Sequence, residues 1–410
     1  MNEVRIALRN VGHIDPMSID EYIRAGGYEA LKKARTMDRG ELIVTIEETS
    51  RLRGRGGAAF PTGKKWSSAF KNDSEVKYIV CNADEGEPGT YKDRVIMEGD
   101  PHTVVEGILI GAYAVGAKEC FIYVRGEYEN SIRLLRNAVK QAEDKGLCGD
   151  TVIKVVSGAG AYVCGEGTAI VNSLEGVRGE PRLKPPSMAV AGLHKKPTIV
   201  NNVETFAVIP EIITKGADWF GAIGSEKYPG TKLMCMSGDV VNKVCVEVPT
   251  NATLRDVVEG FGGGVANGKK LKAIQLGGSS CGFVTPDQLD TPIDFDSIRA
   301  IGASLGSGAV YVIDETRNIV DILAEIAKFY RHESCGKCSP CREGTMRIAE
   351  ILEKFAAGSG TKADIELIES MSDYMKMSCF CPLGQSATTG FMSALKLFPE
   401  DFDAKLRKEA

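Results

Sequence analysis

The sequence predicts an α/β protein with three parts: a mostly parallel sheet, a small α+β module and a helical bundle. In the first half of the chain, short apolar runs alternate with amphipathic helical segments, the order typical of a parallel sheet with right-handed crossovers. From about residue 230 the order becomes strand, strand, helix, strand. From about residue 315 onward, apolar residues recur at helical spacing, which indicates packed helices.

The composition is that of an ordinary globular chain. It has 410 residues, enough for two or three domains, of which 43% are hydrophobic and 26% are charged. The net charge of −5 gives no reason to expect nucleic acid as a partner. The longest apolar run, residues 107–117, is too short to cross a bilayer, and the N-terminus has no signal-peptide pattern. The 12 cysteines are too few and too scattered for a disulfide scaffold, so we expect a cytoplasmic protein without membrane insertion.

Residues 1–53 predict a helical lead-in, with Ser18 and Asp38 as helix N-caps. The next stretch is rich in glycine, which lets a backbone approach a ligand closely and lets clustered N–H groups bind an anion. Thr62 is expected to cap a helix whose N-terminus favours phosphate, with Lys65 in reach. A flexible surface loop is the alternative. The glycine loop that we expect at a ligand consists of Gly54, Arg55, Gly56 and Gly57.

The alternation that follows predicts two linked β-α-β units. Ligands on such sheets bind beyond the carboxyl ends of the strands. The loops at those ends hold the glycines and carboxylates of this region, and parallel topology puts the loops side by side. The strands are expected at residues 78–81, 120–124 and 152–156, the helices at 104–115, 132–139 and 168–174, and the three loops at 82–89, 125–128 and 158–167.

Polar side chains after these strands are candidate ligand contacts. Asp84, Glu85 and Glu87 are expected to accept hydrogen bonds from ribose or ribityl hydroxyls, although a charged run of this kind is more often a solvated turn. The third loop lacks the G-x-G-x-x-G spacing of dinucleotide-binding proteins, so its glycines alone are weak support for a nucleotide. Further along, Asn201 and Asn202 offer two amides for phosphate or ring contacts.

The α+β module is expected to have strands at residues 232–237, 244–248 and 271–276 and a helix at 253–259. It carries no clear catalytic constellation, so we expect it to contact or position partners. The bundle helices are expected at residues 319–330, 348–355, 361–375 and 385–397, and Thr361 with Asp364 resembles a capping box for the third. Four helices with short loops make an up-down bundle, in which the first and third loops lie at the same end.

A cysteine run in the first of these loops predicts a metal centre. Cys335, Cys338 and Cys341 stand at C-x2-C-x2-C, so that three thiolates reach one point, and four thiolates at such spacing suit a [4Fe-4S] cluster. The fourth must come from elsewhere: Cys381 is the candidate in the third loop, and Cys379 competes for the role. Structural zinc is the alternative, but its sites usually come as two C-x2-C pairs.

Taken together, the motifs resemble those of the NADH-binding flavoprotein subunit of respiratory complex I. The same family includes the diaphorase subunits of NAD-dependent hydrogenases and formate dehydrogenases. The resemblance runs from about residue 52 to the C-terminus, and the family's C-x-L-G context for the fourth cluster ligand selects Cys381 over Cys379. The matching blocks are residues 54–66, 81–93, 160–166, 181–186, 201–205, 333–344 and 381–384.

The resemblance implies a fold and two cofactors. It implies a Rossmann-like FMN and NAD(P)H domain over residues 54–229, a ubiquitin-like (β-grasp) domain over 230–314 and a four-helix bundle with one [4Fe-4S] cluster over 315–410, after the lead-in at 1–53. The nicotinamide is implied near Glu87 and the adenosine near Phe60. The full set of expected cofactor-binding residues is Gly54, Arg55, Gly56, Gly57, Phe60, Lys65, Asn82, Asp84, Glu85, Glu87, Tyr162, Gly165, Glu166, Gly167, Lys184, Asn201 and Asn202.

The implied function is that of an electron-input (diaphorase) subunit. It exchanges hydride between NAD(H) or NADP(H) and FMN, without a catalytic side chain, and passes single electrons through the cluster to partners. The partners implied are a thioredoxin-like [2Fe-2S] subunit and a larger iron–sulfur subunit. The chain departs from the family pattern at Ser68, Gly167 and Ser187, which in the family line the adenosine half of the nucleotide pocket. A flavin and iron–sulfur relay that no longer binds a nucleotide is therefore the alternative.

Overall fold

The structure is a computed structural model, and it describes residues 3–407. Its contacts divide the chain into two units. The first unit consists of Met1–Gly86, Thr90–Cys235 and Cys245–Ala252, and the second of Glu87–Gly89, Met236–Val244 and Thr253–Ala410. The domain limits expected from the sequence remain a prediction.

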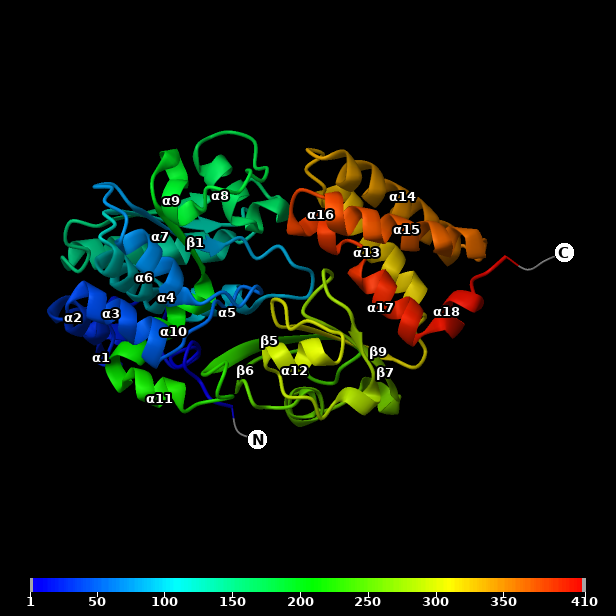
Figure 1. The fold of residues 1–410 in the computed structure, drawn as a ribbon. Coiled ribbons are helices and arrows are strands. Elements are labelled where there is room, and N and C mark those ends of the chain that lie inside the picture. The colour runs from blue at the N-terminus through cyan, green and yellow to red at the C-terminus, as the bar shows by residue number, and fades with distance from the viewer. Residues whose placement is uncertain (1–2, 408–410) are drawn as a thin grey trace. The chain divides into compact units, whose positions relative to one another are not determined.

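A four-stranded parallel sheet organises the first unit (Figure 1). Its strands are β1 (Tyr78–Ala83), β2 (Glu119–Val124), β3 (Val152–Ser157) and β4 (Thr198–Asn202), in the order β3-β2-β1-β4. The three predicted strands are confirmed. Strand β4 was not predicted, because its last two residues are polar amides and its apolar part, Ile199 and Val200, is only two residues long.

The helices of the first unit agree with the predicted caps at two places and differ at one. Ser18 accepts a hydrogen bond from the backbone of Glu21, and Asp38 caps the helix that begins at Arg39. The expected cap at Thr62 is wrong: Pro61 is the N-cap and Thr62 is the first helical residue. The helices are α1 (Ile19–Arg24), α2 (Glu29–Thr36), α3 (Arg39–Val44), the π-helix η1 (Thr45–Thr49), α4 (Thr62–Phe70), α5 (Lys92–Gly99), α6 (Pro101–Val115), α7 (Glu129–Asp144), η2 (Tyr162–Gly165), α8 (Gly167–Leu174), α9 (Met188–Ala191), η3 (Leu193–Lys195), α10 (Val203–Lys215) and α11 (Ala217–Gly221).

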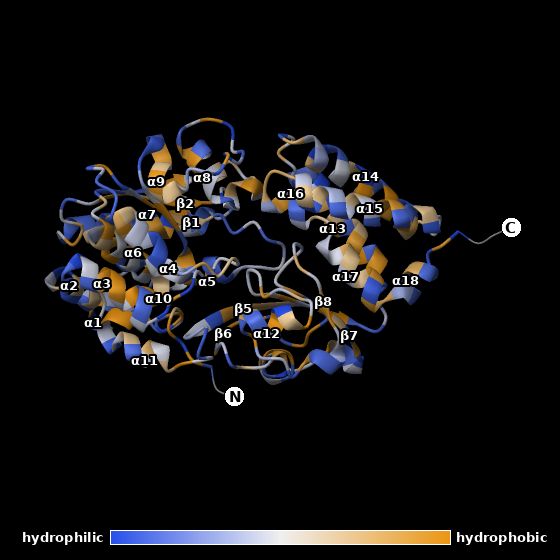
Figure 2. Cartoon of the chain, viewed as in Figure 1, coloured by the Kyte–Doolittle hydropathy of each residue, from blue (hydrophilic) through white to orange (hydrophobic). Residues whose placement is uncertain are grey.

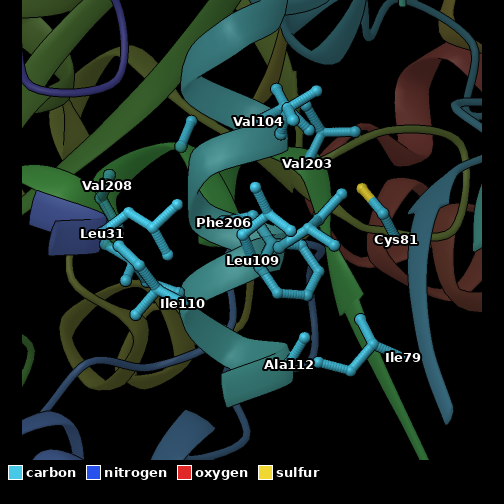
Figure 3. Packing of buried hydrophobic residues seen from close by; sticks show 14 of the residues in the cluster. Leu31, Ile79, Cys81, Val104, Leu109, Ile110, Ala112, Val203, Phe206 and Val208 are labelled. Atoms are coloured by element: carbon cyan, nitrogen blue, oxygen red, sulfur yellow. The ribbon is translucent and has the colours of Figure 1, made fainter. Parts of the chain in front are cut away.

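Both faces of the parallel sheet are covered, as expected for strands of this kind. On one face, α6 is buried nearly all round, between α10 and β1 (Figure 3). Gly107 of α6 is required there, because a Cβ at this position would lie 2.2 Å from the carbonyl oxygen of Phe206 in α10. On the other face, Tyr78 of β1 packs in a smaller cluster with Val171 of α8 and Leu193.

The α+β segment has the predicted order of strand, strand, helix, strand. Strands β5 (Thr231–Gly238) and β6 (Cys245–Pro249) pair antiparallel, and the hairpin lies mostly in the first unit. The predicted helix is present as a short turn of helix that leads into the π-helix η4 (Asp256–Phe261). In the second unit, β7 (Leu271–Leu276) pairs antiparallel with β8 (Phe283–Val284) and β9 (Ala309–Asp314). The remaining elements are η5 (Ala266–Gly268), η6 (Pro286–Gln288) and α12 (Phe295–Ala300).

The C-terminal part of the second unit is helical. Its helices are α13 (Ile319–Glu333), α14 (Ser339–Ala356), α15 (Lys362–Ser378), α16 (Pro382–Ser386), α17 (Thr389–Leu397) and α18 (Pro399–Asp403). Figure 2 shows hydrophobic and hydrophilic residues mixed along α13, α14 and α15, as in helices with one buried face. The capping box of Thr361 and Asp364 is confirmed. The single fourth helix was wrong: the chain breaks between α16 and α17, where the hydroxyl of Thr388 bonds that of Ser372 at 2.7 Å. Within the described residues, none of the helices has the length and apolar character needed to cross a membrane.

Candidate functional site

The sheet topology places a ligand crevice in the first unit. Strand β1 leads to β2 on one side, whereas β4, which follows β3 in the chain, lies on the other side of β1. The carboxyl ends of β1 and β4 therefore form the topological switch point, where ligands of open parallel sheets bind. Asn82 of β1 lies opposite Asn202 of β4, so two of the predicted amides meet there. The missed strand β4 is thus what brings Asn201 and Asn202 to the predicted loops.

The glycine loop lies against the start of α10. A Cβ on Gly56 would lie 3.1 Å from the Cβ of Asn202, so only glycine allows this close approach without a shift. The backbone N–H of Arg55 donates to Oγ1 of Thr205 at 2.9 Å, and that of Gly54 donates to the carbonyl of Phe60 at 2.9 Å. The loop is therefore an anchored cradle rather than a free surface segment.

The Arg55 side chain points away from this cradle. It is fully buried, and its Nη2 donates to the carbonyl of Pro229 at 2.6 Å. Its Nε and Nη1 have no hydrogen-bond partner among the described residues, and burial lowers the pKa of the guanidinium. The side chain of Arg55 is therefore not directed to a ligand at the loop, and its backbone N–H already anchors the loop to Thr205.

Two lysines supply positive charge near the loop. Nζ of Lys65 donates to the carbonyl of Val200 at 3.0 Å and lies 5.7 Å from the centre of the Phe60 ring. Burial, and secondarily the charge of Lys184, lowers the pKa of Lys65. Nζ of Lys184 bonds Oε1 of Glu166 at 2.8 Å. Because burial and the charge of Lys184 both disfavour the ammonium of Lys65, an anion such as a phosphate beside Lys65 would stabilise it.

The acidic residues of the loop after β1 have different hydrogen-bond partners. Glu85 accepts the backbone N–H groups of Asp93 at 2.9 Å and Arg94 at 3.1 Å, and so holds the first turn of α5. Burial, with the nearby charge of Asp93, raises the pKa of Glu85 to about 7. Glu87 belongs to the second unit and accepts from the backbone and hydroxyl of Ser279 at 2.5 and 2.6 Å. Asp84 is buried, and its backbone N–H donates to Oδ1 of Asn82 at 3.1 Å.

The loop after β3 closes over the same region. Asn82 donates to the carbonyl of Gly165 at 2.9 Å, and a Cβ on Gly86 would lie 3.0 Å from the Tyr162 ring. Glu166 caps α8 by accepting the N–H groups of Thr168 and Ala169. At Gly167 a Cβ would lie 2.5 Å from the terminal methyl of Met188. Met188 therefore occupies the space next to the position where the family pattern has an acidic residue.

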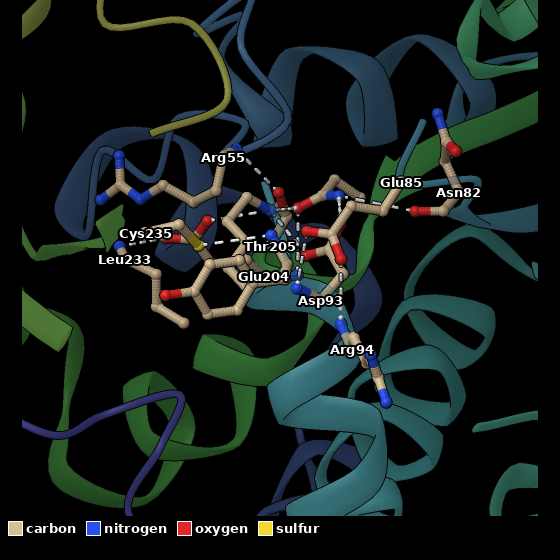
Figure 4. Close-up of polar contacts among 12 residues, drawn as sticks. Arg55, Asn82, Glu85, Asp93, Arg94, Glu204, Thr205, Leu233 and Cys235 are labelled. Atoms are coloured by element: carbon tan, nitrogen blue, oxygen red, sulfur yellow. Dashed lines mark hydrogen bonds and ion pairs between the residues drawn. The ribbon is translucent and has the colours of Figure 1, made fainter. Parts of the chain in front are cut away.

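The two predicted amides are tied to protein groups that the sequence did not single out. Oδ1 of Asn201 accepts Nε1 of Trp66 at 3.1 Å. Asn202 caps α10, accepts Nζ of Lys92 at 3.1 Å and donates to Asp93 at 2.6 Å. Figure 4 shows Asp93, Glu204 and Thr205 within this set of polar contacts. No periodicity could have found Lys92, because a lysine in a short amphipathic stretch is normally placed in solvent.

The second unit brings five cysteines to neighbouring helix ends. Cys338 is the N-cap of α14, with Cys341 in its first turn, and Cys381 is the N-cap of α16. Cys379 is the C-cap of α15, whereas Cys335 lies in the loop before α14. Thiolates at helix N-termini are stabilised by the exposed N–H groups and the helix dipole. Three of the four predicted ligands, Cys338, Cys341 and Cys381, therefore lie at the N-terminal ends of helices.

Close packing at Gly384 joins the two cysteine segments. A Cβ there would lie 2.7 Å from Sγ of Cys379 and 3.0 Å from Cβ of Cys341. The Cys379 thiol lowers the pKa of Cys341 to about 6, and burial raises the pKa of Cys381 to about 11. Among residues 3–407, no three cysteine, histidine or acidic side chains converge closely enough to hold a single metal ion. A four-iron cluster is larger than one ion, so its thiolates stand further apart.

The residues present fit both cofactors that the sequence implied. The glycine cradle, the paired lysines and the amides at the switch point suit a flavin mononucleotide, which has one phosphate and a polar chain. The neighbouring thiols at helix ends suit a cluster held by thiolates. Which individual side chains touch either cofactor remains a prediction.

Comparisons with known proteins agree with this geometry. Residues 48–211 match the family model described as the Nuo51 FMN-binding domain, and residues 321–405 match the NADH-ubiquinone oxidoreductase-F iron-sulfur binding region. The chain is 46% identical over 410 residues to the NADP-reducing hydrogenase subunit HndC of Solidesulfovibrio fructosivorans, covering 98% of this chain and 83% of the relative. It is 44% identical to the F 2 subunit of the NADH-quinone oxidoreductase of Rhizobium meliloti (strain 1021), covering 98% of each chain.

Among solved structures, the NAD+-reducing [NiFe]-hydrogenase in its H2-reduced state contains a similar chain. The TM-score is 0.88 at 34% identity, and the match covers 99% of this chain and 68% of the other. The two family models fall on the glycine cradle with its sheet and on the cysteine-bearing helices, respectively. The chain therefore belongs to the family of FMN- and [4Fe-4S]-binding F subunits of NADH-quinone oxidoreductases and related hydrogenases.

Proposed function

We propose that this chain is the electron-input subunit, or diaphorase, of a larger oxidoreductase. It exchanges hydride between NAD(H) or NADP(H) and FMN, and single electrons leave through one [4Fe-4S] cluster to a partner subunit. The observation that carries the proposal is the meeting of the glycine cradle with the ends of β1 and β4, in a chain that also gathers thiols at helix ends. Family membership supports both cofactors.

The protein's part in this reaction is binding and orientation. When bound, FMN supplies two-electron hydride chemistry and one-electron transfer, which the cluster continues. Lys65 and Lys184 attract phosphate groups, and the glycine cradle offers backbone N–H groups. The proposed cluster ligands are Cys335, Cys338, Cys341 and Cys381, with two of them as N-caps of α14 and α16. No side chain is asked to act as a general acid or base.

We propose reduced discrimination between NADH and NADPH. A carboxylate that binds the adenosine ribose also repels a 2′-phosphate, and in this chain glycine stands at position 167 with the methyl of Met188 beside it. Ser68 and Ser187 are exposed and offer no ring for stacking on adenine. The relative from Solidesulfovibrio fructosivorans, named as NADP-reducing, supports this direction.

The same three positions favour a second candidate function. With no carboxylate at Gly167 and no aromatic side chain at Ser68 or Ser187, the chain could hold FMN and cluster as a relay without binding a nucleotide. For either function we propose a thioredoxin-like [2Fe-2S] subunit and a larger iron–sulfur subunit as partners, in the cytoplasm. The names of the relatives, which are subunits of hydrogenase and quinone oxidoreductase, support an assembly of this kind.

The experiment that tests the proposal is an anaerobic titration of the full chain, purified with FMN bound. NADH and NADPH are added separately, and bleaching of the flavin absorbance is followed. We expect both nucleotides to bleach it, with rates closer together than in a strictly NADH-specific enzyme. If dithionite bleaches the flavin but neither nucleotide does, the chain is a flavin and iron–sulfur relay and does not oxidise a nicotinamide nucleotide.

A further inference from the structure

A network of buried charges lies next to Asn202, the residue against which the glycine cradle packs. The side chains of Lys92 and Lys232 are 1% and 0% exposed, and both bond Oε2 of Glu204, at 3.2 and 2.6 Å. Lys92 also bonds Oδ1 of Asp93 at 2.6 Å. Burial of charge is costly unless such partners are present, so this network needs all of its members. Figure 4 shows Glu204 and Asp93 within it.

The network reaches the cradle through Asn202. Lys92 donates to Oδ1 of Asn202 at 3.1 Å, and Oδ1 also accepts the backbone N–H of Glu204 at 3.0 Å. Nδ2 of Asn202 donates to Oδ2 of Asp93 at 2.6 Å, with the carbonyl of Asn82 at 3.5 Å. An amide has two acceptor and two donor positions, so the protein engages all four. The amide of Asn202 is therefore fully used within the protein, and Asn202 can affect the glycine cradle only through where its side chain lies.

That position determines how closely the glycine loop can approach. The Cβ and Cγ of Asn202 would lie 3.1 and 3.6 Å from a Cβ at Gly56, so the side chain forms the wall on which the loop rests. Rotation of the Asn202 side chain would leave its Cβ in place but would move Cγ and Nδ2, which lie 3.6 and 3.9 Å from the same point. The bonds to Lys92 and Asp93 hold these two outer atoms of the wall in position. Thr205, one turn further along α10, fixes the same loop at the N–H of Arg55.

We infer that Lys92 is a positioning residue for FMN: with Asp93 it locks Asn202 as the wall behind Gly56 and so holds the glycine cradle in its binding shape. Lys232 provides a contrast within the same network. It bonds the same oxygen of Glu204 and the carbonyl of Leu233 at 3.2 Å, and none of its described hydrogen bonds goes to Asn202. The inference rests on the proposed flavin site but not on nucleotide binding.

The test is the dissociation constant of FMN in the full chain, measured by quenching of flavin fluorescence, for matched variants. Lys92→Met and Lys232→Met each remove a buried ammonium from Glu204, but only the first also removes a bond to Asn202. Loss of a hydrogen bond to a charged group predicts that Lys92→Met weakens FMN binding about tenfold or more, and Lys232→Met much less. The visible circular dichroism of the bound flavin should change only in Lys92→Met. Equal weakening in both would overturn the inference.

A double-mutant cycle separates positioning from a general loss of stability. If Lys92 acts through Asn202, then Lys92→Met in an Asn202→Ala background should cost no further FMN affinity. Full additivity of the two losses would contradict the inference. Should Lys92→Met fail to fold, Asp93→Asn replaces it: Lys92 and Asn202 donate to different oxygens of Asp93, and an amide at 93 presents an NH2 group to one of these two donors. Because no nucleotide is added, these outcomes are independent of whether NADH or NADPH reduces the flavin.

Discussion

The two cofactor regions of the molecule differ in how their residues are held. In the first unit, Asn202, the proposed wall of the flavin site, accepts a hydrogen bond from Lys92, a residue 110 positions away in the sequence. In the second unit, the cysteines lie at the ends of α14, α15 and α16, each within a few residues of a helix boundary. The comparison teaches that three of the four proposed cluster ligands come from one short motif and the fourth from a second helix end, whereas the proposed flavin site depends on buried polar contacts between distant segments.

The largest effect is expected at the cluster, where a single thiol decides occupancy. Cys381→Ser should lose most of the bound iron, because Cys381 is the fourth proposed ligand and the N-cap of α16. Cys379→Ser should retain it, because a hydroxyl can still donate to Cys341. Iron content and the EPR signal of the reduced protein measure both variants. Normal iron content in Cys381→Ser would contradict the assignment and point to Cys379.

A second large effect is expected on stability of the first unit. Glu247 is fully buried and accepts the backbone N–H groups of Ile6, Ala7 and Leu8 at 2.8, 3.0 and 2.9 Å. In Glu247→Gln an amide NH2 replaces one oxygen and faces these donors. Unpaired buried donors cost about 1–3 kcal/mol each, so we expect a loss of roughly 2–4 kcal/mol in the free energy of unfolding. Urea unfolding measures it, and an unchanged midpoint would contradict the role of Glu247.

The same carboxyl predicts a pH dependence. Burial, which outweighs the hydrogen bonds, raises the pKa of Glu247 from 4.5 to about 7. Between these values the folded protein holds a proton that the unfolded chain has lost, so the contribution is full below pH 4.5 and falls as pH rises to about 7. The stability of the parent relative to Glu247→Gln should therefore decrease over this range. A difference that grows with pH would contradict the raised pKa.

A smaller effect is expected where one hydroxyl anchors the glycine loop. Thr205→Val keeps the shape of the side chain but removes the oxygen that accepts the N–H of Arg55. A lost hydrogen bond that leaves a buried donor unpaired costs about 1–3 kcal/mol, so FMN affinity should fall roughly tenfold. Thr205→Ser keeps the hydroxyl and is the control. Equal FMN affinity in Thr205→Val and the parent would show that the loop holds its shape without this anchor.

The smallest effect is expected at the nucleotide. Gly167→Glu combined with Met188→Ala adds a carboxylate and removes the methyl that would lie 2.5 Å from its Cβ. Like-charge repulsion of the 2′-phosphate should lower kcat/KM for NADPH relative to NADH by about two- to fivefold, since exposed charges interact with about 0.2–1 kcal/mol. Met188→Ala alone is the control and should leave the ratio unchanged. If the double variant also leaves the ratio unchanged, position 167 does not set nucleotide preference.

The sequence predicted the local parts of this molecule well. The alternation of short apolar runs and helices predicted β1, β2 and β3, and residue spacing predicted the capping box at Thr361, whereas the ligand roles of Cys335, Cys338 and Cys341 remain a prediction. It did not predict β4, whose polar end obscured its pattern, or the break before Thr388, where a tertiary hydrogen bond to Ser372 competes with helix continuation. The buried Lys92 network could not be predicted, because it depends on which distant segments meet.

The central claim is that electrons from a nicotinamide nucleotide pass through the flavin to the cluster of this chain. The most direct test is anaerobic addition of NADH or NADPH to the FMN-bound protein, with flavin absorbance and the EPR signal of the cluster recorded together. The account predicts that the flavin bleaches and the cluster signal appears in the parent, whereas in Cys381→Ser the flavin bleaches without that signal. Failure of both nucleotides to bleach the flavin, or reduction of the cluster in protein stripped of FMN, would contradict it.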